Sequence, residues 1–176
     1  FPSWSPDGRT VRFYACPQCG WREVSRMGGG LRALMVPQGV PDTLADITWS
    51  PDDARVAYFV GDTLFVAARG EEPRVLFALA SELLRAGQRH SVAWSPDGRR
   101  IAFVNGHYRI NWRNDPIPSS IWVVEVESGE AWEVVGGSAA NFSPTWFDAR
   151  RLLFVSTREG PRAAFVVDVG RPGKPG

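Results

Sequence analysis

One short motif recurs along the chain at nearly constant spacing. Residues 4–9 read Trp-Ser-Pro-Asp-Gly-Arg, and related strings begin at Trp49 and Trp94, so that successive copies start 45 residues apart. A shorter fourth copy begins at Trp146, 52 residues after the third. A repeat of about 40–45 residues with strand-forming segments is typical of the blades of a β-propeller, which contain four strands each. The spacing therefore predicts an all-β fold, a β-propeller of about four blades of four-stranded antiparallel sheet. An outer fourth strand is visible in the second and third copies, is doubtful in the first and is absent from the fourth.

The residues of the motif suit a tight turn between two strands. In Ser-Pro-Asp-Gly the proline fixes φ at the second position of a type I turn, and the glycine accepts a positive φ after it. Asp53 replaces this glycine in the second copy, and Asp is one of the few other residues that tolerate positive φ. An apolar segment follows each turn. The third strand of each blade is expected next, at residues 31–36, 64–68, 121–126 and 164–169.

The repeated string carries a resemblance to a known family. Trp-Ser-Pro-Asp-Gly-Arg-x-(Val/Ile)-x-Phe, followed by a strand such as Ile121-Trp122-Val123-Val124-Glu125, resembles the WD40-like repeats of TolB-type β-propellers. The resemblance covers almost the whole chain. It gives one propeller domain at residues 1–170, followed by a Pro/Gly tail at 171–176. The blades are expected at residues 1–45, 46–90, 91–142 and 143–170.

Four blades are few for a propeller. Six or seven blades of this length would need roughly 270–315 residues, whereas this chain has 176. We therefore interpret the chain as a fragment of a six- to eight-bladed propeller, completed by further blades of the same protein. Completion by a second copy, or a small four-bladed ring, are the alternatives, because an open arc would expose two apolar sheet faces.

The tryptophans of the motif are interpreted as residues that pack one blade against the next, because aromatic residues at one repeat position usually serve repeat packing. The alternative is a ladder on which bases or sugars stack. The aspartates of the motif are assigned to the turns. The residues with these structural roles are Trp4, Asp7, Trp49, Asp52, Trp94, Asp97 and Trp146.

The long connections are expected at one end of the sheets. In a propeller blade, the link between the second and third strands lies at the same end as the link to the next blade. Long links are assigned to residues 15–30, 78–91, 105–119 and 136–143. Binding sites are usually built on such loops, and Trp, Tyr and Arg dominate interface hot spots. The predicted binding residues are Trp21, Arg22, His107, Tyr108, Arg109, Trp112 and Arg113.

For two of these residues, Trp21 and Trp112, the alternative is that they only anchor their own loops. A second candidate site is the pair Cys16 and Cys19, which resembles one half of a zinc ribbon. The chain contains no second cysteine pair. A zinc site would need two further ligands, from two histidines at the same end of the sheets, from another chain or from a lost part of this one. We therefore favour a local disulfide or two reduced thiols.

Other classes of function find little support. The net charge of +1 is small for a general binder of nucleic acid or of anionic membranes. No apolar run reaches the roughly 18–20 residues that cross a bilayer. The chain has no Gly-x-Ser-x-Gly motif and no paired acid and base. We therefore expect no catalytic residue and no cofactor.

The resemblance implies a non-enzymatic scaffold that binds a protein or peptide. It also implies a place outside the cytoplasm of a bacterium, periplasmic or secreted. One alternative is the gating propeller of a prolyl-oligopeptidase-like or tricorn-like serine peptidase, whose catalytic domain lies outside this chain. Another is a sensor propeller tethered to a kinase or a regulator. The flanking sequence distinguishes these three hypotheses.

Overall fold

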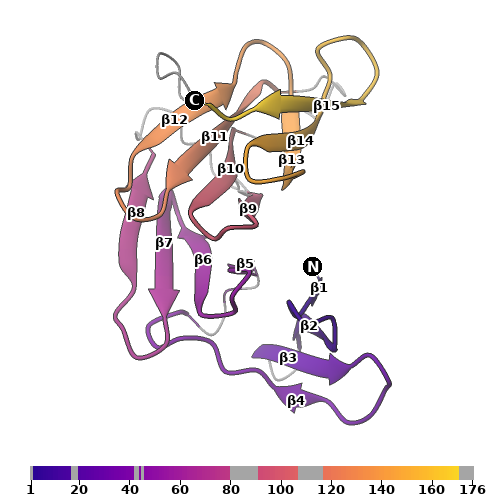
Figure 1. Cartoon of the computed structure of the whole chain (residues 1–176), viewed down its shortest axis with the longest axis vertical. Coiled ribbons are helices and arrows are strands. Elements are labelled where there is room, and N and C mark those ends of the chain that lie inside the picture. The colour runs from indigo at the N-terminus through magenta and orange to yellow at the C-terminus, as the bar shows by residue number, and fades with distance from the viewer. Residues whose placement is uncertain are drawn as a thin grey trace.

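The computed structural model describes residues 2–16, 20–41, 44, 46–79, 91–106 and 117–170. Within these ranges all regular structure is β, arranged in four antiparallel sheets that we number in chain order (Figure 1). The described residues contain no helix that could span a membrane. The predicted all-β repeat fold is thus confirmed.

Each sheet is a simple meander, so that strands adjacent in sequence are adjacent in the sheet. The first sheet contains β1 (Ser3–Trp4), β2 (Thr10–Ala15), β3 (Gly20–Ser25) and β4 (Arg32–Ala33). The second contains β5 (Ile47–Trp49), β6 (Arg55–Val60), β7 (Thr63–Ala68) and β8 (Arg74–Ala78). The third contains β9 (Val92–Trp94), β10 (Arg100–Gly106), β11 (Ser119–Glu125) and β12 (Ala131–Val135). The fourth contains β13 (Asn141–Trp146), β14 (Arg151–Ser156) and β15 (Ala163–Asp168).

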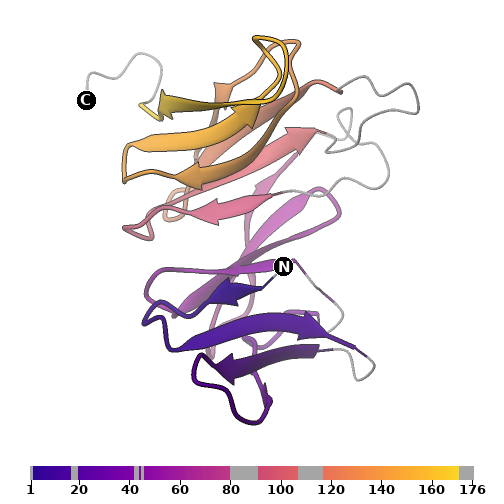
Figure 2. The same ribbon diagram turned by 90° about the vertical axis from the view of Figure 1, so that its right-hand side faces the viewer.

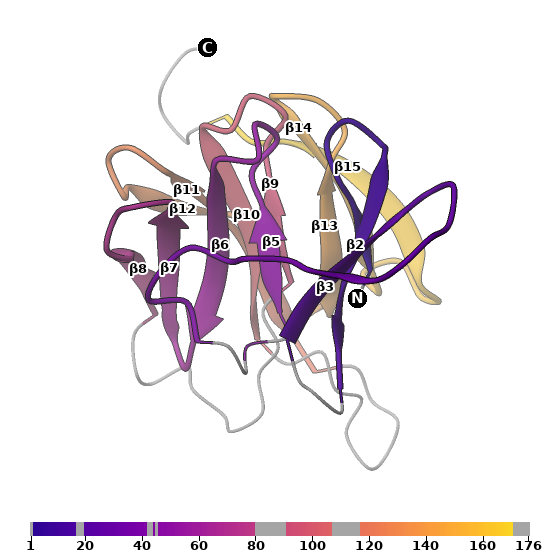
Figure 3. The same cartoon turned by 90° about the horizontal axis from the view of Figure 1, so that it is seen from below.

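The sheets are stacked face to face in chain order (Figure 2). Strand β9 contacts both β5 and β13, so the first strands of the last three sheets lie side by side (Figure 3). The repeated turns, at residues 5–9, 50–54, 95–99 and 147–150, share one end of the sheets, which we call the turn end. At the opposite end, which we call the link end, the second strand of each sheet ends and the third begins. The last strand of a sheet also ends there before the chain enters the next sheet.

The third strand of the first sheet differs from the sequence prediction. It is β3, paired with β2 from Thr10↔Ser25 to Ala15↔Gly20. Residues 31–36, predicted for this role, contribute only the two-residue outer strand β4, and the side chains of Leu31 and Met35 are exposed. The prediction was wrong because it followed apolar runs, whereas β3 reads Gly-Trp-Arg-Glu-Val-Ser.

This change alters the connections as well. The predicted long link at residues 15–30 is a short link followed by a strand. The connection after β3, residues 26–31, lies at the turn end, where the Arg26 amide donates to the Arg9 carbonyl at 2.9 Å.

The core lies between the sheets. One cluster of buried side chains joins the second and third sheets, and another joins the third and fourth. A third cluster packs Val40, from the connection between the first two sheets, against Val56 and Tyr58. None of these clusters of described residues includes a residue of β1–β4. The first sheet is therefore held to the second by other contacts.

Candidate functional site

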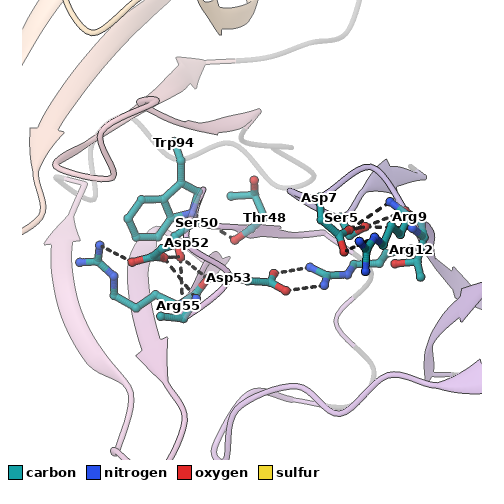
Figure 4. Close-up of polar contacts among 12 residues, drawn as sticks. Ser5, Asp7, Arg9, Arg12, Thr48, Ser50, Asp52, Asp53, Arg55 and Trp94 are labelled. Carbon is teal, nitrogen blue, oxygen red and sulfur yellow. Dashed lines mark hydrogen bonds and ion pairs between the residues drawn. The ribbon is translucent and has the colours of Figure 1, made fainter.

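The polar groups of the repeated turns bind one another. In the third copy, the Ser95 hydroxyl donates to the Asp97 carboxylate at 2.5 Å and accepts from the Arg100 amide at 2.9 Å. The Asp97 carboxylate also accepts from the Arg99 amide at 3.0 Å. The same contacts recur in the first two copies (Figure 4), between Ser5 and Asp7 and between Ser50 and Asp52. These groups stabilise the turn and leave little for a ligand.

The fourth copy lacks the serine and forms its turn differently. The Asp148 carboxylate accepts from the amides of Arg150 and Arg151, each at 2.8 Å. The Arg151 side chain donates to the same carboxylate at 2.7 Å. Asp148 alone thus makes the side-chain hydrogen bonds that stabilise this turn, whereas a serine and an aspartate share them in the other three copies.

These contacts make the stability of the protein depend on pH. The hydrogen bond from the Ser50 hydroxyl lowers the pKa of Asp52 below its ordinary value of 3.8, although burial opposes this. The pKa values of the other turn aspartates are also lowered: Asp7, Asp97 and Asp148. Each carboxylate therefore stabilises the fold fully above the unfolded-state pKa, and this contribution is lost as the pH falls through the folded-state value.

We expect Asp52→Asn to make stability less sensitive to acid. The asparagine keeps an acceptor for Ser50 and for the Ala54 amide but cannot be protonated in this range. Urea unfolding between about pH 6 and pH 2 should show a smaller loss of unfolding free energy for the variant than for the wild type. Equal losses in the two proteins would contradict the assigned role of Asp52.

Two of the motif tryptophans join neighbouring sheets in the same way. Trp94 and Trp146 are only 8 % and 9 % exposed. The Trp94 indole donates to the Thr48 carbonyl at 3.1 Å, and the Trp146 indole donates to the Ala93 carbonyl at 3.0 Å. Each acceptor immediately precedes the motif tryptophan of the preceding sheet. This geometry supports a packing role and leaves little of either indole exposed.

The first two tryptophans behave differently. Trp4 is 61 % exposed. The Trp49 indole nitrogen is buried and has no hydrogen-bond partner among the described residues. The ring of Trp49 lies under the guanidinium of Arg12, whose central carbon is 4.7 Å from the ring centroid.

Arg12 connects the first sheet to the second. Its side chain is 7 % exposed and forms a two-point ion pair with Asp53, in which Nη2 and Oδ2 are 2.5 Å apart (Figure 4). The hydrogen bond to Asp53 raises the pKa of Arg12 above its ordinary value. The backbone of Asp53 has a positive φ of 63°, and its carboxylate reaches Arg12 from this conformation. The sequence reasoning missed this pair, although Arg12 aligns with Ala57 and Ala102 in the other copies.

A pocket of about 480 Å³ opens between the first strands of the first three sheets. Indoles, prolines and small side chains form its wall: Trp4, Pro6, Thr48, Trp49, Ser50, Pro51, Val92, Ala93 and Trp94. None of the described residues that line it has an ionisable side chain. Among the described residues, no group of three His, Cys, Asp or Glu side chains is placed to hold a metal ion. The described wall thus combines indole rings with hydroxyl groups and holds no acid or base.

The predicted binding residues fall into two sets. Trp21 and Arg22 lie within strand β3 rather than in a long loop. The Trp21 side chain is buried, its indole donates to the Leu44 carbonyl at 3.0 Å, and it packs edge-on against Tyr14. It therefore anchors the connection between the first two sheets. The others lie outside the described residues: His107, Tyr108, Arg109, Trp112 and Arg113.

The described residues on either side of this second set lie at the link end. The chain leaves β10 at Gly106 and enters β11 at Ser119, and these two residues are paired at the link end. Cys16 also lies at this end, and it is disulfide-bonded, whereas Cys19 lies outside the described residues. Zinc is bound by thiolates, so the sulfur of Cys16 is not a zinc ligand in this state.

Comparison with known proteins gives two kinds of similarity. No protein-family model matches the chain. One curated relative, the uncharacterized peptidase YuxL of Bacillus subtilis, is 33 % identical over 75 residues. These residues make up 42 % of this chain and 11 % of that protein.

Solved structures match over a larger part of the chain. A putative TolB from Agrobacterium tumefaciens has a TM-score of 0.63 at 20 % identity, over 97 % of this chain and 61 % of that one. A puromycin-hydrolyzing peptidase of Mycobacterium tuberculosis has a TM-score of 0.62 at 21 % identity, over 97 % of this chain and 29 % of that one. The chain thus spans less than two thirds of the length of each of these proteins.

Proposed function

The chain has the repeat fold of TolB-type β-propellers, and on that premise we propose that it is a non-catalytic scaffold that binds a protein or peptide at the link end. The contrast between the two ends carries the proposal. At the turn end, serine, aspartate and backbone groups satisfy one another. The link end carries the connections that differ in length from sheet to sheet, where binding residues are usually placed.

The proposed contact residues are those of the connection between β10 and β11. Tyr108, Arg109, Trp112 and Arg113, with His107, combine aromatic surface with positive charge. Such side chains contribute most of the binding energy in many protein interfaces. We assign no contact role to the buried indole of Trp21. The partner that fits this set is a peptide segment with apolar and acidic side chains.

A peptide library tests this proposal. Phage-displayed peptides selected on the wild-type chain should bind it and lose at least about tenfold in affinity for the triple variant Arg109→Ala, Trp112→Ala and Arg113→Ala. The matched control is Arg9→Ala with Arg99→Ala, which removes two exposed charges from the turn end. The control should bind like the wild type. Selection of no peptide, or equal binding by the triple variant, would overturn the proposal.

A second candidate function is the gating propeller of a serine peptidase. The local similarity to a curated peptidase and the fold of a puromycin-hydrolyzing peptidase favour it. Translation of the complete reading frame provides the test. A neighbouring domain with a Gly-x-Ser-x-Gly motif followed by Asp and His would support this function. Further blades without such a domain would support the scaffold.

The same reading frame would show what covers the outward face of the fourth sheet. On that face the paired residues Leu153 and Val166 are exposed. Burial of such side chains stabilises a fold, so we propose that further blades of the same protein pack here. A second copy of the chain is the alternative, and it would appear as a dimer in sedimentation equilibrium.

We also propose a location outside the cytoplasm, periplasmic or secreted. The disulfide at Cys16 supports it, because disulfides persist in oxidising compartments. Fractionation of the source cells, with detection of the chain in the periplasm or medium, would check this. Recovery of the protein only from the cytoplasm would contradict it.

A further inference from the structure

The first two sheets lack a contact that the other sheets make. The indoles of Trp94 and Trp146 each donate to the carbonyl of the residue just before the motif tryptophan of the preceding sheet. By the same rule the acceptor for Trp49 is the carbonyl of Ser3. In the part of the chain that the structure describes, the Trp49 indole nitrogen has no hydrogen-bond partner, although it is buried. Buried donors without a partner are destabilising and are rare in folded proteins.

The position of Arg12 accounts for the missing contact. When the repeats are aligned on their motifs, Arg12 corresponds to Ala57 and Ala102, and both alanines are completely buried between sheets. An arginine side chain at this position occupies far more space than a methyl group. The guanidinium covers the ring of Trp49 on its way to Asp53. An arginine at this position therefore leaves the two sheets less room to approach each other than an alanine does.

The details of the ion pair support this interpretation. Arg12 Nε is a second buried donor without a partner in this contact region. Asp53 stands where the first and third copies have Gly8 and Gly98. In the third copy, the carbonyl of Gly98 receives Arg55 of the preceding sheet at 3.1 Å. Between the first and second sheets, the carboxylate of Asp53 takes the place of this carbonyl. It binds Arg12, which lies two residues further along its strand than the position that corresponds to Arg55.

We propose that Arg12 is a spacer that keeps the first sheet out of a closer docked position. In that position the Trp49 indole donates to the Ser3 carbonyl, as Trp94 and Trp146 do to their acceptors. The pocket lined by Trp4, Trp49 and Trp94 is narrower there, because the first two sheets, which approach each other, both contribute residues to its wall. The Arg12–Asp53 pair thus sets the width of this pocket. The inference does not depend on the proposed partner.

The double variant Arg12→Ala with Asp53→Gly tests the proposal, because it gives both positions the residues of the third repeat. A spin-labelled amino acid is introduced at two exposed turn positions: Met27, between β3 and β4 of the first sheet, and Glu127, between β11 and β12 of the third. Electron–electron distance measurements should show a shift to shorter distances in the double variant. The matched control is Arg55→Ala, which removes the arginine that covers Trp94. The control should keep the wild-type distances.

A second readout follows the hydrogen bond itself. The indole signal of Trp49, identified by its loss in Trp49→Phe, should exchange with deuterium about fivefold more slowly in the double variant, because one hydrogen bond is gained. Wild-type distances with unchanged exchange in a cooperatively folded double variant would overturn the proposal. If the double variant does not fold, Arg12→Ala alone gives the same comparison, because 37 % of the Asp53 side chain is already exposed.

Discussion

Replacement of Phe103 by alanine is expected to lower the free energy of unfolding by about 3–5 kcal/mol, the range for deletion of a buried aromatic ring. The Phe103 side chain is completely buried. It lies between the second and third sheets, with its ring centroid 5.5 Å from that of Phe59 and 5.7 Å from that of Phe77. Alanine would leave a cavity between two sheets that pack through this ring.

Urea unfolding followed by circular dichroism measures this effect. The control is Phe147→Ala in the fourth turn, where the ring is exposed and contacts only the guanidinium of Arg151 among its described ring contacts. That control should cost less than about 1 kcal/mol. A loss below about 1 kcal/mol for Phe103→Ala would show that the second and third sheets are not joined as described.

Replacement of Asp53 by asparagine is expected to cost about 2–4 kcal/mol, because it leaves the charge of Arg12 buried without its counter-charge. Asparagine accepts the same positive φ as aspartate, so the change tests the charge and not the backbone. The cost falls toward the lower part of the range for buried pairs because Asp53 is partly exposed. Water can then reach the remaining amide group.

The matched control for the ion pair is Asp148→Asn in the fourth turn. Asp148 and Arg151 are 2.6 Å apart, and both side chains are at least 40 % exposed. Exposed pairs of this kind contribute less than about 1 kcal/mol. Similar losses for Asp53→Asn and Asp148→Asn in urea unfolding would mean that burial of Arg12 adds nothing. Recovery of stability in Arg12→Ala with Asp53→Gly would connect the loss to the buried charge.

The strands differ in how well the sequence predicts them. Strands that follow a motif were found from their apolar residues, as β10 and β14 show. Strand β3 was not found, because it has no apolar run: its two large apolar residues are separated by Arg22 and Glu23. The assignment of Trp21 to a loop failed for the same reason.

What the sequence alone determined is the repeat and its turns. The hydrogen bonds that form each turn join residues two to five positions apart, such as Ser95 with Asp97 and Arg100. Local sequence therefore carries the full chemical information for these turns, and the spacing of the motif gives the number of sheets.

Only the tertiary structure decided how the sheets meet. Arg12 and Asp53 are 41 residues apart, and the indole of Trp146 finds its acceptor 53 residues away. Such contacts depend on the distance and angle between whole sheets, which packing of many side chains determines together. One large residue at a position that is otherwise alanine changes that distance. For this reason the unpartnered indole of Trp49 and the pocket beside it emerged only from the folded chain.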